Sequence, residues 1–170
     1  MNKVSKASAV LASLPKISGA ARVCAVIGDP IAHSLSPAIH NAAFRSLGMD
    51  LVYVPFRVRA NELKAAIEGI RSLGVLGVNV TMPHKTRVVP LLDAIEKTAL
   101  QIGAVNTIVR NDGRLRGYNT DGQAALAVLQ SLARSLRGRR AVILGAGGAA
   151  RAIVYYLSKT VESIAILNRT

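Results

Sequence analysis

Apolar and polar residues follow two different spacings along the chain, and these spacings predict strands and helices in alternation. Short runs of consecutive apolar residues predict strands at residues 23–27, 51–56, 75–80, 105–109, 141–144 and 163–167. Apolar residues that recur every three or four positions predict helices at residues 37–47, 63–73, 123–136 and, after a glycine-rich segment, up to residue 157. A short helical stretch is also expected before residue 105. Strands that alternate with helices predict an α/β fold in which most strands pair in parallel.

Turn-forming residues mark where some of these elements begin and end. Asn61 is a suitable N-cap for the helix predicted at residues 63–73, and Gly74 is placed to end it. Residues 111–113 read Asn-Asp-Gly, which is typical of a tight hairpin turn.

The composition is that of a folded, globular protein. Hydrophobic residues make up 51% of the 170 residues and charged residues 18%, which suffices for one buried domain or for one domain and part of another. The single cysteine, Cys24, excludes an intrachain disulfide and lies in an apolar run, so we expect a buried structural thiol. This cysteine usage fits a reducing compartment, such as the cytoplasm.

The net charge of +13 raises the question of an acidic partner. Nucleic acid, a membrane surface and small acidic ligands can all attract a basic chain. Nucleic-acid binders usually interleave aromatic with basic residues, whereas aromatics make up only 4% here and tryptophan is absent. We therefore expect a solvated basic surface and no nucleic-acid partner. No stretch approaches the roughly 20 apolar residues of a membrane span, so no membrane partner is expected either.

A glycine-rich segment between a predicted strand and a predicted helix indicates a dinucleotide site. Small residues let the backbone turn tightly and approach a pyrophosphate, which free N–H groups at the helix N-terminus can hold. An arginine ends the next strand, where an NAD site would carry an acidic residue, and its guanidinium can hold the 2′-phosphate of NADP. The predicted cofactor-binding residues are Gly145, Ala146, Gly147, Gly148, Ala149, Ala150, Asn168, Arg169 and Thr170.

Polar residues at the ends of other predicted strands indicate a substrate site. Ligands bind outside the carboxyl ends of strands in open α/β sheets, and hydroxyl and amide side chains suit a ligand with many hydroxyls. The candidates are Ser34, Ser36, Asn79, Thr81, Lys85, Asn106 and Asp121. Each has an ordinary structural alternative. The serines and Asp121 could cap helices, Asn79 and Thr81 could form turns, Asn106 could be a buried amide, and Lys85 could be a surface lysine.

Four segments, in this order, are similar to the motifs of the shikimate dehydrogenase family. They are residues 28–37 (GDPIAHSLSP), 77–85 (GVNVTMPHK), 103–107 (GAVNT) and 119–122 (NTDG), and the glycine segment and the Asn-Arg-Thr ending follow them. The resemblance runs from about residue 21 to residue 170. It implies that Ser34 and Ser36 bind a carboxylate and that Asn79, Thr81, Lys85, Asn106 and Asp121 contact ring hydroxyls. It also implies that Lys85 and Asp121 form the catalytic pair, that NADP is the cofactor, and that no metal takes part.

The resemblance implies a division into two domains. We expect a flexible extension at residues 1–20, a substrate-binding catalytic domain at residues 21–120, and a linking helix with an incomplete Rossmann NADP-binding domain at residues 121–170. Family members continue for roughly another hundred residues, about one small domain. The chain is therefore expected to be a fragment or a truncated enzyme, with exposed apolar faces in its last part, weak cofactor binding and a tendency to aggregate or pair.

The implied activity is the NADP-dependent, reversible reduction of 3-dehydroshikimate to shikimate, in aromatic amino-acid (chorismate) biosynthesis. Three alternatives stay open: a quinate/shikimate dehydrogenase with relaxed specificity, a catalytically silent shikimate-binding fragment, and a polyanion-binding protein. The substrate is expected to be the small-molecule partner, and a homodimer is one assembly that the sequence allows.

Overall fold

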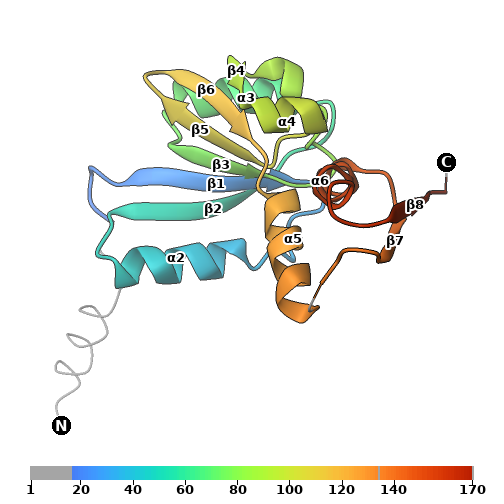
Figure 1. The fold of residues 1–170 in the computed structure, drawn as a ribbon. Helices are drawn as coiled ribbons and strands as arrows, with labels where there is room; N and C mark the ends of the chain where they lie inside the picture. The colour runs from blue at the N-terminus through green and yellow to red at the C-terminus, as the bar shows by residue number, and fades with distance from the viewer. Residues whose placement is uncertain (1–16, 134, 170) are drawn as a thin grey trace, which may run out of the picture.

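The computed structural model describes residues 17–133 and 135–169, whose strands form two sheets (Figure 1). The larger sheet has six strands in the order β2-β1-β3-β5-β6-β4, and the smaller pairs β7 with β8. The elements follow one another as β1 (Arg22–Gly28), α2 (Ser36–Ser46), β2 (Leu51–Arg57), α3 (Leu63–Ser72), β3 (Gly77–Val80), η1 (Val89–Leu91), β4 (Ala94–Ile95), α4 (Lys97–Ile102), β5 (Thr107–Asn111), β6 (Arg114–Tyr118), α5 (Asp121–Leu132), β7 (Arg140–Leu144), α6 (Gly148–Leu157) and β8 (Ser163–Leu167).

The α/β fold predicted from the residue pattern is confirmed. β1 pairs in parallel with both β2 and β3, and β7 pairs in parallel with β8. The larger sheet is mixed, however, because β5 runs antiparallel to β3 and to β6. The turn between β5 and β6 is the predicted hairpin turn, since Asp112 and Gly113 both have positive φ values, 48° and 77°.

The structure corrects several predicted boundaries. The N-cap of α3 is Glu62 rather than Asn61, and the Glu62 side chain makes no capping hydrogen bond to the helix. The helix predicted at residues 123–136 begins earlier, at Asp121, and ends at Leu132, because Ala133 adopts an extended backbone. β6 had no counterpart among the predicted strands. Its residues alternate between exposed and buried, but two arginines and a glycine hide that period in the sequence.

The main hydrophobic core lies between the larger sheet and α3. Ile67 of α3, Ile27 of β1 and Ile108 of β5 are each at most 1% exposed, and they belong to one cluster of buried residues. Cys24 is half-buried, so the expectation of a buried thiol is met only in part. Burial still raises the pKa of the Cys24 thiol, which fits a structural rather than a reactive group.

The outer edge of the larger sheet is formed by β2, with α2 packed beside it. The side chain of Asn41 in α2 makes two hydrogen bonds to the main chain of Tyr53. Its Nδ2 donates to the Tyr53 carbonyl at 2.8 Å, and its Oδ1 accepts from the Tyr53 N–H at 2.9 Å. Pro55 follows two residues later in the same strand.

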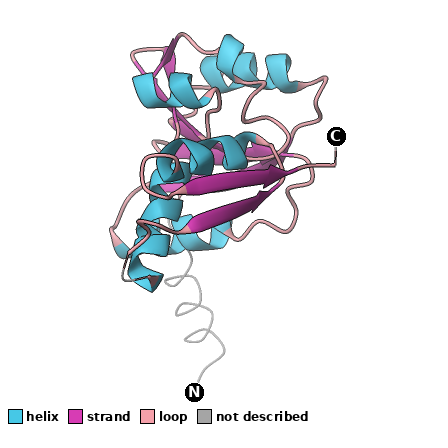
Figure 2. Ribbon diagram, turned by 45° about the vertical axis from the view of Figure 1, so that its right-hand side comes forward, coloured by secondary structure: helices cyan, strands magenta, loops and turns pink. Residues whose placement is uncertain are grey.

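The C-terminal part of the described chain contains the small sheet and two packed helices. Figure 2 shows β7 and β8 side by side, with helices on one side of them. Val142 and Leu144 of β7 are 64% and 80% exposed, so the predicted exposed apolar face is present. Helix α5 packs closely on α6, because a β-carbon on Gly122 would lie 2.2 Å from the carbonyl oxygen of Ala152.

Some predictions concern residues that the structure describes only in part. Residues 1–16 of the predicted extension lie outside the described residues, and so does Thr170. The rest of the extension contacts the fold, since the hydroxyl of Ser18 donates a hydrogen bond to the Asp50 carboxylate. Among the described helices, none combines the length and the apolar character that a membrane crossing requires.

Candidate functional site

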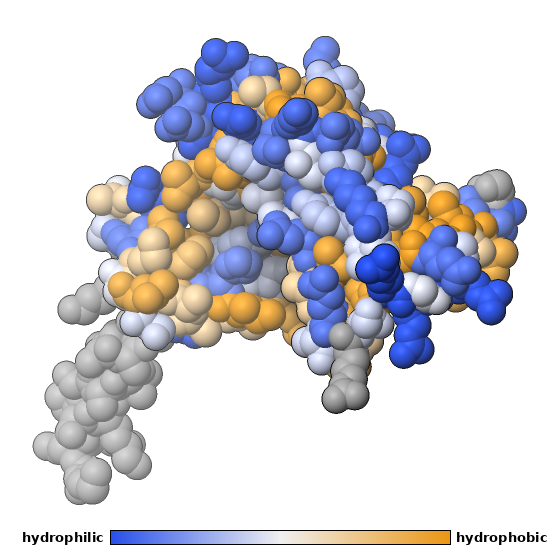
Figure 3. Space-filling model, in the orientation of Figure 1, coloured by the Kyte–Doolittle hydropathy of each residue, from blue (hydrophilic) through white to orange (hydrophobic). Residues whose placement is uncertain are grey.

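All the predicted substrate-site residues line one cleft at the carboxyl ends of β1 and β3. The cleft has a volume of about 290 Å³, and the surface is hollowed near the centre of the face seen in Figure 3, between α2 and α5. The predicted residues in its lining are Ser34, Ser36, Asn79, Thr81, Lys85, Asn106 and Asp121. They come from segments almost 90 positions apart, and the sheet brings them together because the ends of its parallel strands and the start of the antiparallel β5 lie at the same side.

Lys85 and Asp121 form an ion pair inside this cleft. The Lys85 ammonium donates to Asp121 Oδ2 at 2.6 Å, and the two side chains are only 17% and 24% exposed. Asp121 is the first residue of α5, where the partial positive charge of the helix N-terminus favours a carboxylate. The N-cap of this helix is Thr120. Asp121 is therefore not the N-cap, which was the structural role considered for it.

Asn106 holds the carboxylate of Asp121 from the other side. Its Nδ2 donates to Asp121 Oδ1 at 2.8 Å and to Thr120 Oγ1 at 2.9 Å. Its Oδ1 accepts from the Thr120 N–H at 3.0 Å and from the Thr107 hydroxyl at 2.9 Å. Asn106 is 9% exposed and lines the cleft. A fully bonded, buried amide of this kind has little freedom to turn.

Ser34 and Ser36 lie at the start of α2. The helix N-cap is Leu35, which makes no side-chain capping bond. The two serines therefore do not cap α2, which was the structural role considered for them. Ser34 Oγ accepts from the Ser36 N–H at 3.3 Å. Both serines are half-buried and line the cleft, where their hydroxyl groups can donate to a ligand.

Further side chains that had not been predicted lie at or behind this site, among them His33 and His40 in the lining. The ring of His40 lines the cleft and stacks on Tyr53, with the ring centroids 4.3 Å apart and the planes 10° apart. The Tyr53 hydroxyl donates to Asn79 Oδ1 at 2.6 Å. Burial, with a smaller contribution from Cys24, raises the pKa of Tyr53 to about 12, and a hydrogen bond with Ser36 opposes the rise. The phenol is therefore protonated at neutral pH.

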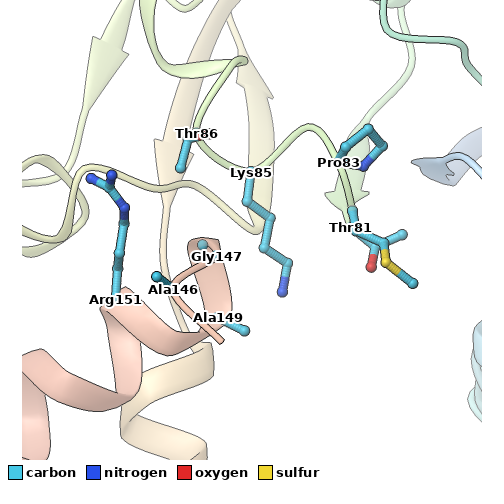
Figure 4. A pocket seen from close by; sticks show the side chains of 10 residues that line it. Thr81, Pro83, Lys85, Thr86, Ala146, Gly147, Ala149 and Arg151 are labelled. Carbon is cyan, nitrogen blue, oxygen red and sulfur yellow. The ribbon is translucent and has the colours of Figure 1, made fainter. Parts of the chain in front are cut away.

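A second cleft, of about 500 Å³, lies between the glycine-rich segment and Lys85. Ala146, Gly147, Gly148 and Ala149 line it, and Figure 4 shows the Lys85 side chain extending toward them. Lys85 lines both clefts, so the two meet at this side chain.

The second cleft also contains residues that had not been predicted. Thr86 and Arg151 line it, and Figure 4 shows them beside each other on the far side of Lys85 from Thr81. Arg151 directly follows the glycine-rich segment, so its position in α6 could have indicated it.

The remaining predicted cofactor residues divide between two places. Gly145, Asn168 and Arg169 line a third, more open cleft at the ends of β7 and β8. Ala150 is half-buried in α6 and is not part of the lining of these clefts. Gly145 has a φ of 102°, a conformation that favours glycine, and Gly147 is the N-cap of α6. The segment thus has the tight turn and the helix N-terminus that a pyrophosphate needs.

Metal ligands are not gathered in the described part of the chain. No group of three or more His, Cys, Asp or Glu side chains there could hold a metal ion. The polar side-chain groups of the two clefts are hydroxyl, amide, imidazole, carboxylate, ammonium and guanidinium groups.

Comparison with known proteins gives consistent matches over most of the chain. Residues 26–108 match the family model described as the shikimate dehydrogenase substrate binding domain. The shikimate dehydrogenase (NADP(+)) of Methanothermobacter thermautotrophicus is 55% identical over 155 residues, which are 91% of this chain and 54% of that protein. The chain thus spans about half the length of the relatives it matches.

Solved structures agree with the sequence matches. The crystal structure of the Aquifex aeolicus shikimate dehydrogenase superposes with a TM-score of 0.87 at 44% identity, over 91% of this chain and 58% of that one. A Thermus thermophilus shikimate 5-dehydrogenase, solved in complex with NADP(H) and shikimate, gives a TM-score of 0.79 at 39% identity, over 88% of this chain and 56% of that one. The chain belongs to the shikimate dehydrogenase family.

Proposed function

We propose that this chain forms the substrate-binding part, and the beginning of the cofactor-binding part, of an NADP-dependent shikimate dehydrogenase. The enzyme would interconvert 3-dehydroshikimate and shikimate in aromatic amino-acid biosynthesis. One observation carries the proposal: Lys85 lies where a polar cleft meets the glycine-rich segment, with its ammonium 2.6 Å from Asp121. A ketone bound in the polar cleft would then have a proton donor on the side that faces the cofactor cleft.

The polar cleft suits a small ring that carries hydroxyls and a carboxylate. Ser34 and Ser36 would donate hydrogen bonds to the carboxylate at one end. Asn79, Thr81 and Asn106 would bond the ring hydroxyls at the other. Buried groups of this kind reject analogues that leave them without partners, which supports a specific substrate.

The glycine-rich segment fits an NADP dinucleotide. Gly148 has no room for a side chain, because a β-carbon there would lie 2.6 Å from Lys85 Cβ, so the main chain can come close to a ligand. N–H groups at the start of α6 would hold the pyrophosphate, and Arg169 would bind the 2′-phosphate. When bound, NADPH supplies the hydride that reduces the ketone.

In the reducing direction, Lys85 would donate a proton to the ketone oxygen as negative charge develops there. Its positive charge also lowers the energy of that developing alkoxide. Asp121 orients the ammonium, and Asn106 in turn fixes Asp121. In the oxidising direction, Lys85 would take the proton back from the substrate hydroxyl.

The domain division follows the same proposal. Residues 21–120 would form the substrate-binding domain, and residues 121–170 a linking helix with part of a Rossmann domain. A small-molecule substrate and a biosynthetic role imply a cytoplasmic location, and a homodimer is an assembly to be tested by sedimentation.

The experiment measures shikimate binding by calorimetry and NADP reduction by the absorbance of the reduced nicotinamide. We expect Lys85→Ala to abolish turnover while it weakens shikimate binding far less, because the other polar groups of the cleft remain. Lys64→Ala is the matched control, since Lys64 is an exposed lysine of α3 outside the clefts.

The outcomes separate the alternatives. Failure of the unaltered chain to bind shikimate would contradict the proposal. Binding without turnover would identify a catalytically silent binding module. Equal turnover with quinate and shikimate would identify an enzyme of relaxed specificity.

A further inference from the structure

A buried tyrosine lies directly behind the polar cleft. Tyr53 of β2 is 3% exposed and is not part of the cleft lining, but its hydroxyl donates to Asn79 Oδ1 at 2.6 Å. Asn79 does line the cleft. Tyr53 therefore acts on the site from behind: its hydroxyl donates to Asn79, and its hydrogen bond with Ser36 and its stacking on His40 are its other links to the cleft.

The direction of each hydrogen bond can be followed from Asp121 back to Asn79. Asp121 is a carboxylate that accepts from Asn106 Nδ2, so the oxygen of the Asn106 amide faces the other way. That oxygen accepts from the Thr107 hydroxyl at 2.9 Å, which uses the only hydrogen of that hydroxyl. Thr107 Oγ1 can then only accept, and its neighbour is Asn79 Nδ2 at 3.4 Å.

The same orientation of Asn79 follows from the other end. A protonated phenol has one hydrogen to donate, and the burial that raises the pKa of Tyr53 to about 12 keeps that hydrogen in place. Asn79 must turn its oxygen to Tyr53 and its NH₂ group away from it. Because the contact with Thr107 is long and that with Tyr53 is short, Tyr53 is the stronger of the two constraints.

Tyr53 is itself held in position. Asn41 bonds both its N–H and its carbonyl, and the ring of His40 stacks on its ring. A side chain with so many constraints has little conformational entropy left to lose when a ligand binds.

We propose that Tyr53 is a positioning residue that locks the Asn79 amide with its NH₂ group as a hydrogen-bond donor to a hydroxyl oxygen of the bound ring. This rests on the proposed function, since it takes shikimate as the ligand. One amide hydrogen of Asn79 points to Thr107, and the second is available to the cleft. The cleft thereby selects an acceptor oxygen at this position.

The test is a double-mutant cycle on shikimate affinity, measured by calorimetry on Tyr53→Phe, Asn79→Ala and the double variant. We expect Tyr53→Phe to weaken binding by about tenfold, which is about 1.4 kcal/mol. In the Asn79→Ala background, the same change has no further effect, because the amide that Tyr53 orients is gone. Tyr155→Phe is the matched control: it removes a hydroxyl that donates to Gln101 at 2.6 Å, away from the polar cleft.

Equal losses from Tyr53→Phe in both backgrounds would overturn the proposal, since the tyrosine would then act on the fold rather than on Asn79. An unchanged shikimate affinity in Tyr53→Phe would also overturn it.

A second measurement needs no tyrosine variant. The side-chain amide proton signals of Asn79, assigned by their loss in Asn79→Ala, should move downfield when shikimate is added, and signals that stay in place would contradict a donor role. If the unaltered chain binds no shikimate, the proposed function fails instead.

Discussion

Gly148 and Lys85 are so close that a β-carbon on Gly148 would lie 2.6 Å from Lys85 Cβ. Real β-carbons essentially never come within 3.0 Å of a heavy atom outside their own and adjoining residues, so the absence of a side chain at Gly148 is required. The glycine-rich segment and the loop that carries Lys85 therefore contact each other through main chain and Cβ. This contact joins the two clefts at the proposed catalytic lysine.

Gly148→Ala should force these two segments apart. Overpacking of this kind costs about 1–3 kcal/mol, so the free energy of unfolding in urea should fall by about that amount. The proposed NADPH affinity should also fall, because the start of α6 moves. Gly147→Ala is the control, with no atom within 4 Å of its β-carbon and a φ of −75°, and it should cost less than about 1 kcal/mol. Similar losses in the two variants would disprove the steric argument.

Gly122→Ala should disrupt the packing of α5 on α6. Its β-carbon would lie 2.2 Å from the carbonyl oxygen of Ala152, and main chain cannot move aside as a side chain can. We expect the free energy of unfolding to fall by at least about 2 kcal/mol. Gly69→Ala in α3 has open space around it and should raise stability by about 0.5–1 kcal/mol. Thermal unfolding of both variants checks the contrast, and a stable Gly122→Ala would contradict it.

Asp93 should make stability depend on pH in the acid range. Its Oδ2 accepts from Arg71 and from the Leu115 N–H, both at 2.6 Å, and the Arg71 bond is the main reason that the pKa of Asp93 is lowered. The unfolded chain binds this proton more readily than the folded one. The stabilisation is therefore present above the unfolded pKa of about 4 and is lost as the pH falls through the folded pKa.

Asp93→Asn tests this dependence. The variant should be less stable than the unaltered chain at pH 7, and the difference should shrink when urea unfolding is repeated at about pH 3. Asp112→Asn, at the tip of the β5–β6 hairpin, controls for the loss of one negative charge. A difference that stays constant between the two pH values would exclude Asp93 as the source.

Arg169→Ala should change the preference between the two nicotinamide cofactors. If Arg169 binds the 2′-phosphate as proposed, its loss should weaken NADPH binding by about tenfold or more and leave NADH binding nearly unchanged. Arg139→Ala removes an equal charge just before β7, away from Gly145, and should alter neither affinity by much. Fluorescence titration with both cofactors measures the effect, and parallel losses for the two would contradict the assignment.

The residue pattern predicted the α/β fold and the polar residues that line the cleft because both depend on local sequence. Apolar periods mark the elements, and polar residues near strand termini can meet at one side of a sheet. Asn79 lies near the end of β3, and Asn106 directly precedes the antiparallel β5, so both lie at the same side. The bond from Tyr53 to Asn79 was not predictable in this way, since it joins residues 26 positions apart in two strands that are not neighbours. Burial decides it, and burial depends on the whole fold. β6 was missed for a related reason: pairing with β5 stabilises a strand whose own residues show only a weak pattern.

The hydrogen bonds of Asn41 to Tyr53 have a consequence for how copies of the chain can associate. An edge strand can recruit a strand from another molecule only through free N–H and C=O groups, which is a common route to aggregation. At Tyr53 both groups are already bonded by Asn41, and Pro55, whose main chain faces the same way, has no N–H to offer. This margin of the large sheet is closed to strand addition at two successive outward positions. Strand addition by a second copy is therefore disfavoured at this margin of the sheet.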